Sequence, residues 1–103
     1  LNKTSRIADI GSGTGILTRQ LLKRGVSVLA VEPNDDMRTK AEQDLQPFEH
    51  FISIKGSAEE TSLPDKSIDL VIAAQAFHWF DQDKFKLECK RILKQDEGRT
   101  GLE

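Results

Sequence analysis

A short apolar run passes directly into a cluster of glycines at residues 7–15, which read Ile7-Ala8-Asp9-Ile10-Gly11-Ser12-Gly13-Thr14-Gly15. The apolar run predicts a buried strand, and leucines at helical spacing predict a helix from Thr14 to Arg24. Glycines allow the backbone to turn sharply and to approach a ligand without a Cβ atom in the way. The first turn of the following helix offers unpaired N–H groups to an anionic or polar ligand. We therefore expect a strand, a binding loop and a helix in direct succession.

The rest of the chain continues this alternation. Three further apolar runs predict strands at residues 26–31, 51–54 and 68–74. One helix is predicted after Asn34 or Asp35, either of which can cap it, and another from Asp81 onward. Parallel strands joined by right-handed crossovers place helices on both faces of one sheet. The predicted fold class is α/β with a doubly wound parallel sheet, in which ligands bind beyond the carboxyl ends of the strands.

Composition excludes several classes of protein. The chain has 103 residues, 15 of them basic and 17 acidic, and a single cysteine, Cys89. One cysteine cannot form an internal disulfide or a cysteine-rich metal site, and no metal site is predicted. A net charge of −2 without a basic block argues against binding to nucleic acid or to an anionic membrane surface. Because there is no bilayer-length apolar stretch and no signal-peptide pattern, we expect one cytoplasmic domain.

An acidic residue follows the second predicted strand. Glu32 lies about twenty residues beyond the first glycine of the loop, the spacing at which a carboxylate binds ribose hydroxyls. The loop and the acid together predict a ligand that contains adenosine. The dinucleotide fingerprint G-x-G-x-x-G would need glycine at position 16, where this chain has Ile16. An NAD-type dinucleotide-binding domain therefore stays the less favoured alternative.

Residues 9–15 resemble motif I of the class I S-adenosylmethionine-dependent methyltransferases, D-x-G-x-G-x-G. The resemblance extends through Val31-Glu32-Pro33-Asn34, Gly56-Ser57-Ala58-Glu59, Ser67-Ile68-Asp69-Leu70-Val71 and Gln75-Ala76-Phe77-His78-Trp79-Phe80. It is closest to the small-molecule branch of the family, methyltransferase type 11. The resemblance implies a Rossmann-like sheet with its first four strands in the order 3-2-1-4. It also implies S-adenosylmethionine as cofactor and a small molecule as methyl acceptor.

The same resemblance implies roles for residues of the glycine loop and the second strand. Asp9 would steady the loop and face the ammonium group of the cofactor. Glu32, followed by Pro33, would bind the ribose hydroxyls. The methionine end of the cofactor would lie along Gly11, Ser12, Gly13, Gly15 and Gln75.

The adenine end of the cofactor would contact residues further along the chain. Met37 would lie along the ligand near the adenine, and Ser57, Ala58 and Glu59 would form the edge against the ring. The family usually has aspartate where this chain has Ser57. A serine can still bond to the adenine amino group with a shorter reach, and Glu59 is an alternative partner.

His78 is the candidate catalytic residue. It follows the fourth predicted strand, where a general base could reach an acceptor, and an unperturbed histidine titrates near neutral pH. The alternative is that Phe77-His78-Trp79-Phe80 is an aromatic stretch that packs against its neighbours. Methyl transfer needs a base only when the acceptor must lose a proton, because the cofactor carries its own activation.

The predicted elements account for only part of the implied enzyme. Related methyltransferases have seven strands, whereas this sequence predicts four, in an S-adenosylmethionine-binding part at residues 1–94 followed by a disordered tail or cloning remnant at 95–103. Residues 70–74 are apolar on both faces, which is typical of a strand inside a sheet. An exposed fourth strand would offer its edge to a second copy, a predicted route to a homodimer. A non-catalytic fragment that binds cofactor or mediates interactions is the other alternative.

Overall fold

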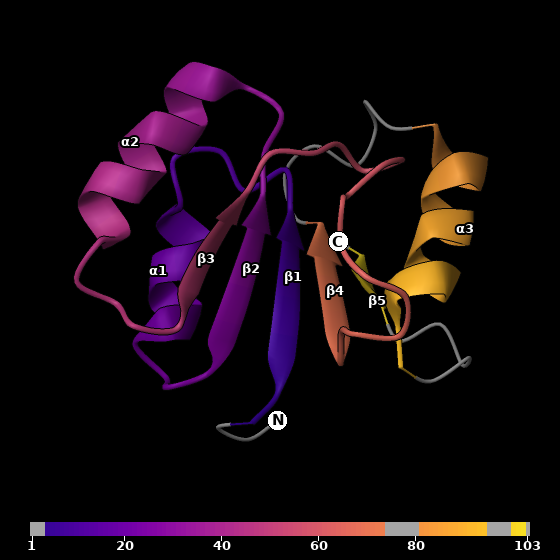
Figure 1. Ribbon diagram of the computed structural model, residues 1–103, viewed down its shortest axis with the longest axis horizontal. Helices are drawn as coiled ribbons and strands as arrows, with labels where there is room; N and C mark the ends of the chain where they lie inside the picture. The colour runs from indigo at the N-terminus through magenta and orange to yellow at the C-terminus, as the bar shows by residue number, and fades with distance from the viewer. Residues whose placement is uncertain (1–3, 74–80, 95–99, 103) are drawn as a thin grey trace.

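The computed structural model describes residues 4–73, 81–94 and 100–102. They form one sheet of five strands in the order β3-β2-β1-β4-β5, accompanied by three helices (Figure 1). In chain order the elements are β1 (Arg6–Ile10), α1 (Ile16–Leu22), β2 (Ser27–Val31), α2 (Asp35–Leu45), β3 (Phe51–Ile54), β4 (Leu70–Ala73), α3 (Gln82–Ile92) and β5 (Thr100–Leu102).

Every pair of neighbouring strands is parallel, so the carboxyl ends of the strands lie at one edge of the sheet (Figure 1). The central strand β1 pairs with β2 along its whole length, with Ile10 opposite Val31. On its other side β1 pairs with β4, where Ile7 lies opposite Leu70. The predicted α/β class and the 3-2-1-4 order of the first four strands are confirmed.

The sheet contains one strand more than the four predicted. β5 pairs with β4 in parallel, with Val71 opposite Thr100 and Ala73 opposite Leu102. The prediction of a disordered tail over residues 95–103 therefore does not hold at residues 100–102. Pairing at a sheet edge uses backbone N–H and C=O groups, which any sequence provides, so the polar tail carried no signal for a strand.

The pairing with β5 also changes the surroundings of β4. Because β5 occupies its outer side, β4 is not an edge strand, and the predicted homodimer through an exposed fourth strand loses its basis. β4 begins at Leu70 and not at Ile68 as predicted, since Ile68 forms only an isolated bridge with Leu93.

Two hydrophobic clusters lie on the two faces of the sheet. Alternate residues of β1 point into different clusters, with Ile7 in one and Ala8 in the other. The first cluster joins α1 and α2 to the sheet and contains Ile7, Leu22, Val26, Val28, Ala41 and Leu45. The second joins α3 and the loop before β4, and its members include Ala8, Leu29, Val31, Ala58, Leu63, Phe85, Cys89 and Ile92. Burial on both faces explains why the strands read as nearly continuous apolar runs.

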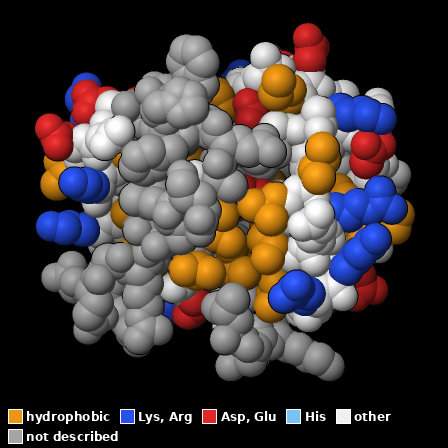
Figure 2. All heavy atoms as spheres, turned by 180° about the vertical axis from the view of Figure 1, so that it is seen from behind, with side chains coloured by type: hydrophobic (Ala, Val, Ile, Leu, Met, Phe, Trp, Pro, Cys, Tyr) orange, Lys and Arg blue, Asp and Glu red, His pale blue; other side chains and the backbone are white. Residues whose placement is uncertain are grey.

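The burial of the β4 side chains differs between the two faces of the sheet. Val71 and Ala73 are fully buried on the α3 side. Leu70 and Ile72 pack against the α1–α2 cluster but stay half-buried. From behind, hydrophobic side chains gather on the surface beside residues that are not described (Figure 2). The predicted apolar character of both faces of this strand is confirmed.

Side-chain caps fix where two of the helices begin. The Asn34 side chain accepts a hydrogen bond from the Met37 amide at 2.9 Å, which makes Asn34, not Asp35, the cap of α2. Asp81 caps α3 in the same way by accepting from the Lys84 amide at 3.2 Å. Such caps satisfy amides that have no partner inside the helix.

Replacing Phe85 by alanine should test the second cluster. Phe85 is fully buried on α3, so Phe85→Ala should lower the free energy of unfolding by about 3–5 kcal/mol. Leu87, on the exposed face of the same helix, serves as the control, and Leu87→Ala should change stability by less than about 1 kcal/mol. Urea denaturation measures both, and equal losses would contradict the assignment of the buried face.

Candidate functional site

The loop after β1 depends on three glycines with backbone angles that other residues rarely adopt. Gly11, Gly13 and Gly15 have φ values of 68°, 61° and 90°. The loop is held against the end of β2, because the Gly11 and Ser12 amides both donate to the Val31 carbonyl, at 2.8 and 3.2 Å. The predicted strand, glycine loop and helix are therefore present in direct succession, although α1 begins at Ile16 rather than Thr14.

Glu32 joins this loop to the end of the neighbouring strand. It directly follows β2 and is only 6% exposed. Its Oε1 accepts from the Gly13 amide at 2.7 Å, and its Oε2 accepts from the Asn34 amide at 2.9 Å. A carboxylate has about four acceptor positions, so both oxygens retain capacity for ligand hydroxyls. The structure thus brings together the loop and the acid that the spacing predicted to be neighbours.

Asp9 lies beneath the glycine loop, near the end of β1. It is 3% exposed, and its Oδ2 accepts from the Thr18 hydroxyl of α1 at 2.5 Å. Burial is the main cause that raises the pKa of Asp9 to about 6; the Thr18 hydrogen bond opposes this shift, and the nearby Glu32 charge adds to it. Thr18, which was not among the predicted site residues, is fully buried; a hydroxyl inside an otherwise apolar helix face is the sequence signal for it.

Gly15 has a packing role that accounts for the position of the third glycine. It is buried, and a Cβ atom there would lie 2.8 Å from Leu45 Cδ1 and 3.3 Å from Ala41 Cβ, both on α2. The next residue, Ile16, is 68% exposed, so a glycine is not required there. The missing glycine of the dinucleotide fingerprint therefore has a structural explanation: α2 approaches the backbone at position 15.

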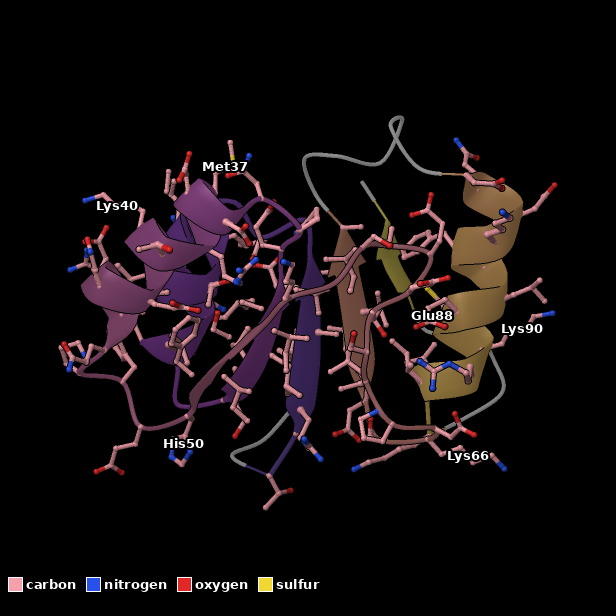
Figure 3. All side chains as sticks on the ribbon, turned by 45° about the horizontal axis from the view of Figure 1, so that its top comes forward. Met37, Lys40, His50, Lys66, Glu88 and Lys90 are labelled. Atoms are coloured by element: carbon pink, nitrogen blue, oxygen red, sulfur yellow. The ribbon has the colours of Figure 1, made fainter. Side chains whose placement is uncertain are left out.

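Met37 lies beside the glycine loop. It is 46% exposed and projects from the beginning of α2 (Figure 3). Its Sδ is 3.9 Å from the position that a Cβ atom on Gly13 would take. Pro33, between Glu32 and the α2 cap, is exposed. An apolar side chain therefore stands at the mouth of the loop, where the flat face of a ligand could pack.

The predicted adenine edge is a tight turn at residues 57–60. The Ser57 amide donates to the Glu60 carbonyl at 3.0 Å, and the Ser57 hydroxyl accepts from the Glu60 amide at 3.1 Å. Ala58 is only 3% exposed and packs in the second cluster. The Glu59 Oε2 accepts from the Asp81 amide at 3.1 Å. Ser57 therefore closes the turn, and Glu59 reaches toward the start of α3.

Two of the predicted site residues lie outside the described residues, namely Gln75 and His78. Within residues 4–73, 81–94 and 100–102, no group of three or more His, Cys, Asp or Glu side chains could hold a metal ion. Over the same described residues, no helix is long and apolar enough to cross a membrane.

Comparison with known proteins identifies the family. The sequence profile described as "Methyltransferase domain" matches residues 8–98. The chain belongs to this methyltransferase family. The match confirms the resemblance stated on motif I and covers the glycine loop, Glu32 and the turn at 57–60. It favours the methyltransferase interpretation over the dinucleotide-binding alternative.

Individual relatives agree with the family match. An uncharacterized methyltransferase of Mycobacterium tuberculosis is 40% identical over 97 residues, which are 94% of this chain and 38% of the relative. A solved structure from Anabaena variabilis, described as a methyltransferase from an antibiotic biosynthesis pathway, is 41% identical with a TM-score of 0.81, covering 93% of this chain and 37% of that chain.

A third solved structure, from Methanococcus maripaludis, is described as an S-adenosyl-L-methionine-dependent methyltransferase. It is 26% identical to this chain with a TM-score of 0.82, and the match covers 89% of this chain and 44% of the other. This chain thus spans less than half the length of each of the three proteins it is compared with.

Gly15→Ala should destabilise the fold more than a matched change at Gly25. Both glycines have φ near +90°, at 90° and 85°, but a Cβ atom at Gly25 would meet nothing within 4 Å. Gly25→Ala therefore reports the backbone strain alone, roughly 1–2 kcal/mol. Gly15→Ala should cost about 1–3 kcal/mol more because its methyl group overlaps α2. Urea denaturation measures the difference, and equal losses would contradict the packing role of Gly15.

Asp9→Asn should stabilise the ligand-free protein at neutral pH. Since its pKa in the folded protein is raised from 3.8 to about 6, the protonated carboxyl is favoured by folding. The stabilisation of the folded protein by the protonated carboxyl, relative to the ionised one, is complete below pH 3.8 and is lost as the pH rises through about 6. An asparagine carries no charge and keeps an oxygen for Thr18, so the gain at pH 7.5 should reach up to about 3 kcal/mol.

Urea denaturation at pH 7.5 and pH 5 checks this prediction. The gain of Asp9→Asn over the wild type should shrink at the lower pH, where the wild-type carboxyl is largely protonated. Glu49→Gln, which removes a charge at an exposed carboxylate, serves as the control. A wild type at least as stable as Asp9→Asn at pH 7.5 would show that the buried charge is not unfavourable.

Proposed function

We propose that this chain binds S-adenosylmethionine and is the cofactor-binding part of a methyltransferase that acts on a small molecule. The observation that carries the proposal is the hydrogen bond between Glu32, at the end of β2, and the Gly13 amide of the loop after β1. This bond brings a carboxylate beside the backbone of the glycine loop, which supports a joint role of the two in binding a ligand that contains ribose. The likeness to a solved structure from Methanococcus maripaludis that is described as an S-adenosyl-L-methionine-dependent methyltransferase supports the same cofactor.

Different residues of the site would contact different parts of the cofactor. Glu32 would accept hydrogen bonds from the ribose hydroxyls, and the glycine loop would contact the methionine end. The Asp9 carboxylate would attract the ammonium group, and a cation there would favour its ionised form. Met37 would pack along the adenosine, and the Ser57 turn would meet the edge of the ring.

The chain's residues would act by binding, orienting and excluding water. S-adenosylmethionine supplies an activated methyl group when bound, so alignment with the acceptor is the main requirement on the protein. His78 as a general base stays a prediction, as does the contact of Gln75 with the methionine moiety. The small-molecule acceptor is proposed for the whole protein from the resemblance to methyltransferase type 11, and the cytoplasmic location stays a prediction.

Calorimetric titration with S-adenosylmethionine and with NAD tests the proposal. The wild type should bind the first saturably and the second not at all. Glu32→Gln should weaken binding by roughly 10- to 100-fold, because hydrogen bonds to a charged group contribute about 1.5–3 kcal/mol. Glu49→Gln, which changes an exposed carboxylate away from the loop, should bind as the wild type does.

Circular dichroism must show that Glu32→Gln is folded, since Glu32 also accepts from two backbone amides. A wild type that does not bind S-adenosylmethionine would contradict the proposal. Undiminished affinity in a folded Glu32→Gln would remove the role assigned to Glu32.

A further inference from the structure

The turn at residues 57–60 is held from outside by α3. At its beginning, a Cβ atom on Gly56 would lie 2.7 Å from the Thr61 carbonyl oxygen, so the backbone at 56 packs directly against Thr61. The turn is thus a small closed loop whose two ends meet at Thr61. Contacts that hold Thr61 in place therefore also hold the turn in place.

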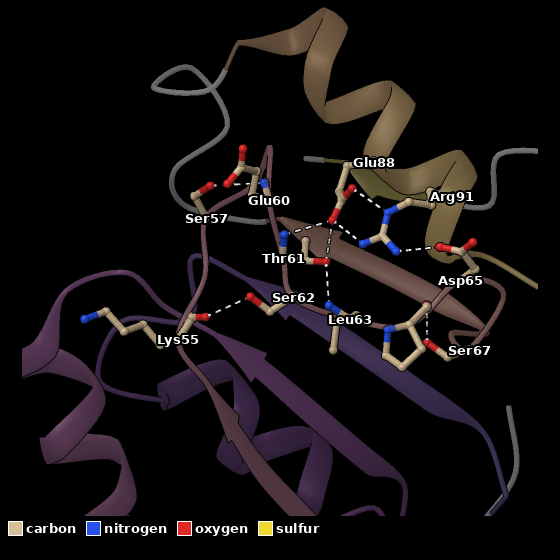
Figure 4. A network of polar contacts seen from close by, with 11 residues as sticks. Lys55, Ser57, Glu60, Thr61, Ser62, Leu63, Asp65, Ser67, Glu88 and Arg91 are labelled. Carbon is tan, nitrogen blue, oxygen red and sulfur yellow. Dashed lines mark hydrogen bonds and ion pairs between the residues drawn. The ribbon is translucent and has the colours of Figure 1, made fainter.

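Thr61 is fixed by one carboxylate of α3. The Glu88 Oε2 accepts from the Thr61 amide at 2.8 Å and from the Thr61 hydroxyl at 2.6 Å (Figure 4). Thr61 is fully buried and Glu88 is 8% exposed, so water does not compete freely for these bonds. Glu88 and Thr61 lie 27 positions apart in the sequence. The pair is therefore a tertiary link between the turn and the helix.

The Glu88 carboxylate is itself held in one orientation. Arg91, one helical turn further along α3, donates to Oε1 at 2.9 Å and to Oε2 at 2.7 Å. Arg91 also donates to Asp65 at 2.6 Å, which links the segment between β3 and β4 to α3 at a second position (Figure 4). Hydrogen bonding to Arg91 is the main cause that holds the pKa of Glu88 at about 2. The charge that binds Thr61 is present throughout the neutral range.

A second contact holds the tip of the turn against the same helix. The Glu59 carboxylate accepts from the Asp81 amide at the beginning of α3. Between these contacts the turn and α3 border a hollow of about 790 Å³, lined in part by Ser57, Glu60 and Lys84. Ala58 packs in the second cluster, whereas Ser57 and Glu60 face the hollow, where polar contacts link the turn to α3.

We propose that Glu88, acting through Thr61, is a positioning residue that sets the Ser57–Glu60 turn at the adenine edge of the cofactor. This inference rests on the proposed function, which assigns the turn to the adenine ring. To recognise the edge of a ring, the donors and acceptors of the protein must stay within about 0.5 Å of their binding positions. A turn at the surface needs supporting contacts to achieve this. Loss of the link should reduce the discrimination between purine rings and leave the ribose and methionine contacts of the glycine loop in place.

The test compares two ligands that differ at the ring edge, S-adenosylhomocysteine and S-inosylhomocysteine. The second has a carbonyl in place of the adenine amino group and an N–H in place of the ring acceptor. The wild type should prefer the adenine ligand by about tenfold or more. Calorimetry should show that Glu88→Gln and Thr61→Val lose most of this preference through weaker adenine binding, with unchanged affinity for the inosine ligand. Thr61→Ser, which retains the hydroxyl, should keep the wild-type preference.

The outcomes separate this inference from the function on which it rests. A wild type that binds neither ligand overturns both. A wild type that binds both ligands equally overturns the positioning role, and so does an undiminished preference in folded Thr61→Val. An equal loss for both ligands in Glu88→Gln and Thr61→Val also overturns it, because that is the result of general destabilisation. Should Glu88→Gln not fold, the comparison of Thr61→Val with Thr61→Ser gives the answer.

Discussion

The hydrogen bond between the Gly13 amide and the Glu32 carboxylate connects the ends of the two central strands, and the candidate site is built around it. It exists because β1 and β2 are parallel and in register from Arg6 opposite Ser27 to Ile10 opposite Val31. Parallel pairing brings the loop after one strand beside the residue after the next, although they are 19 positions apart. The carboxylate thereby stabilises a glycine loop with unusual backbone angles and keeps acceptor positions that its two amide bonds do not use.

The parallel pairing of the strands also explains the distribution of packing and polar contacts. Both faces of the sheet are buried, so the polar groups that serve the site are confined to the carboxyl ends of the strands and the loops that follow. Asp9 is one exception, since it lies inside the fold and bonds to Thr18. A buried carboxylate of this kind is unfavourable for the ligand-free fold, and function is a physical reason to retain it.

Much of the fold and part of the site could be predicted from local patterns. The apolar runs, the glycine cluster and the acid after the second strand each carry a short-range signal, and the structure places them as expected. The strand β5 carried no such signal, because a sheet edge pairs with the backbone of a polar segment. The link between Glu88 and Thr61 was equally invisible, since Glu88 belongs to a charged helix face that is ordinarily solvated.

Local sequence alone establishes the succession of the first four strands and the three helices, the glycine loop and its acidic partner, because hydrophobic periodicity and glycine act over a few residues. Tertiary structure decides which polar side chains are buried and what they bond to. Gly15 is required because Leu45 and Ala41 of α2 approach it, which no pattern within the loop reveals. Glu88 is buried and bonds to Thr61, because the loop that contains Thr61, 27 residues earlier, packs against α3. Such contacts depend on distances in space, and these are set only when the helices pack on the sheet.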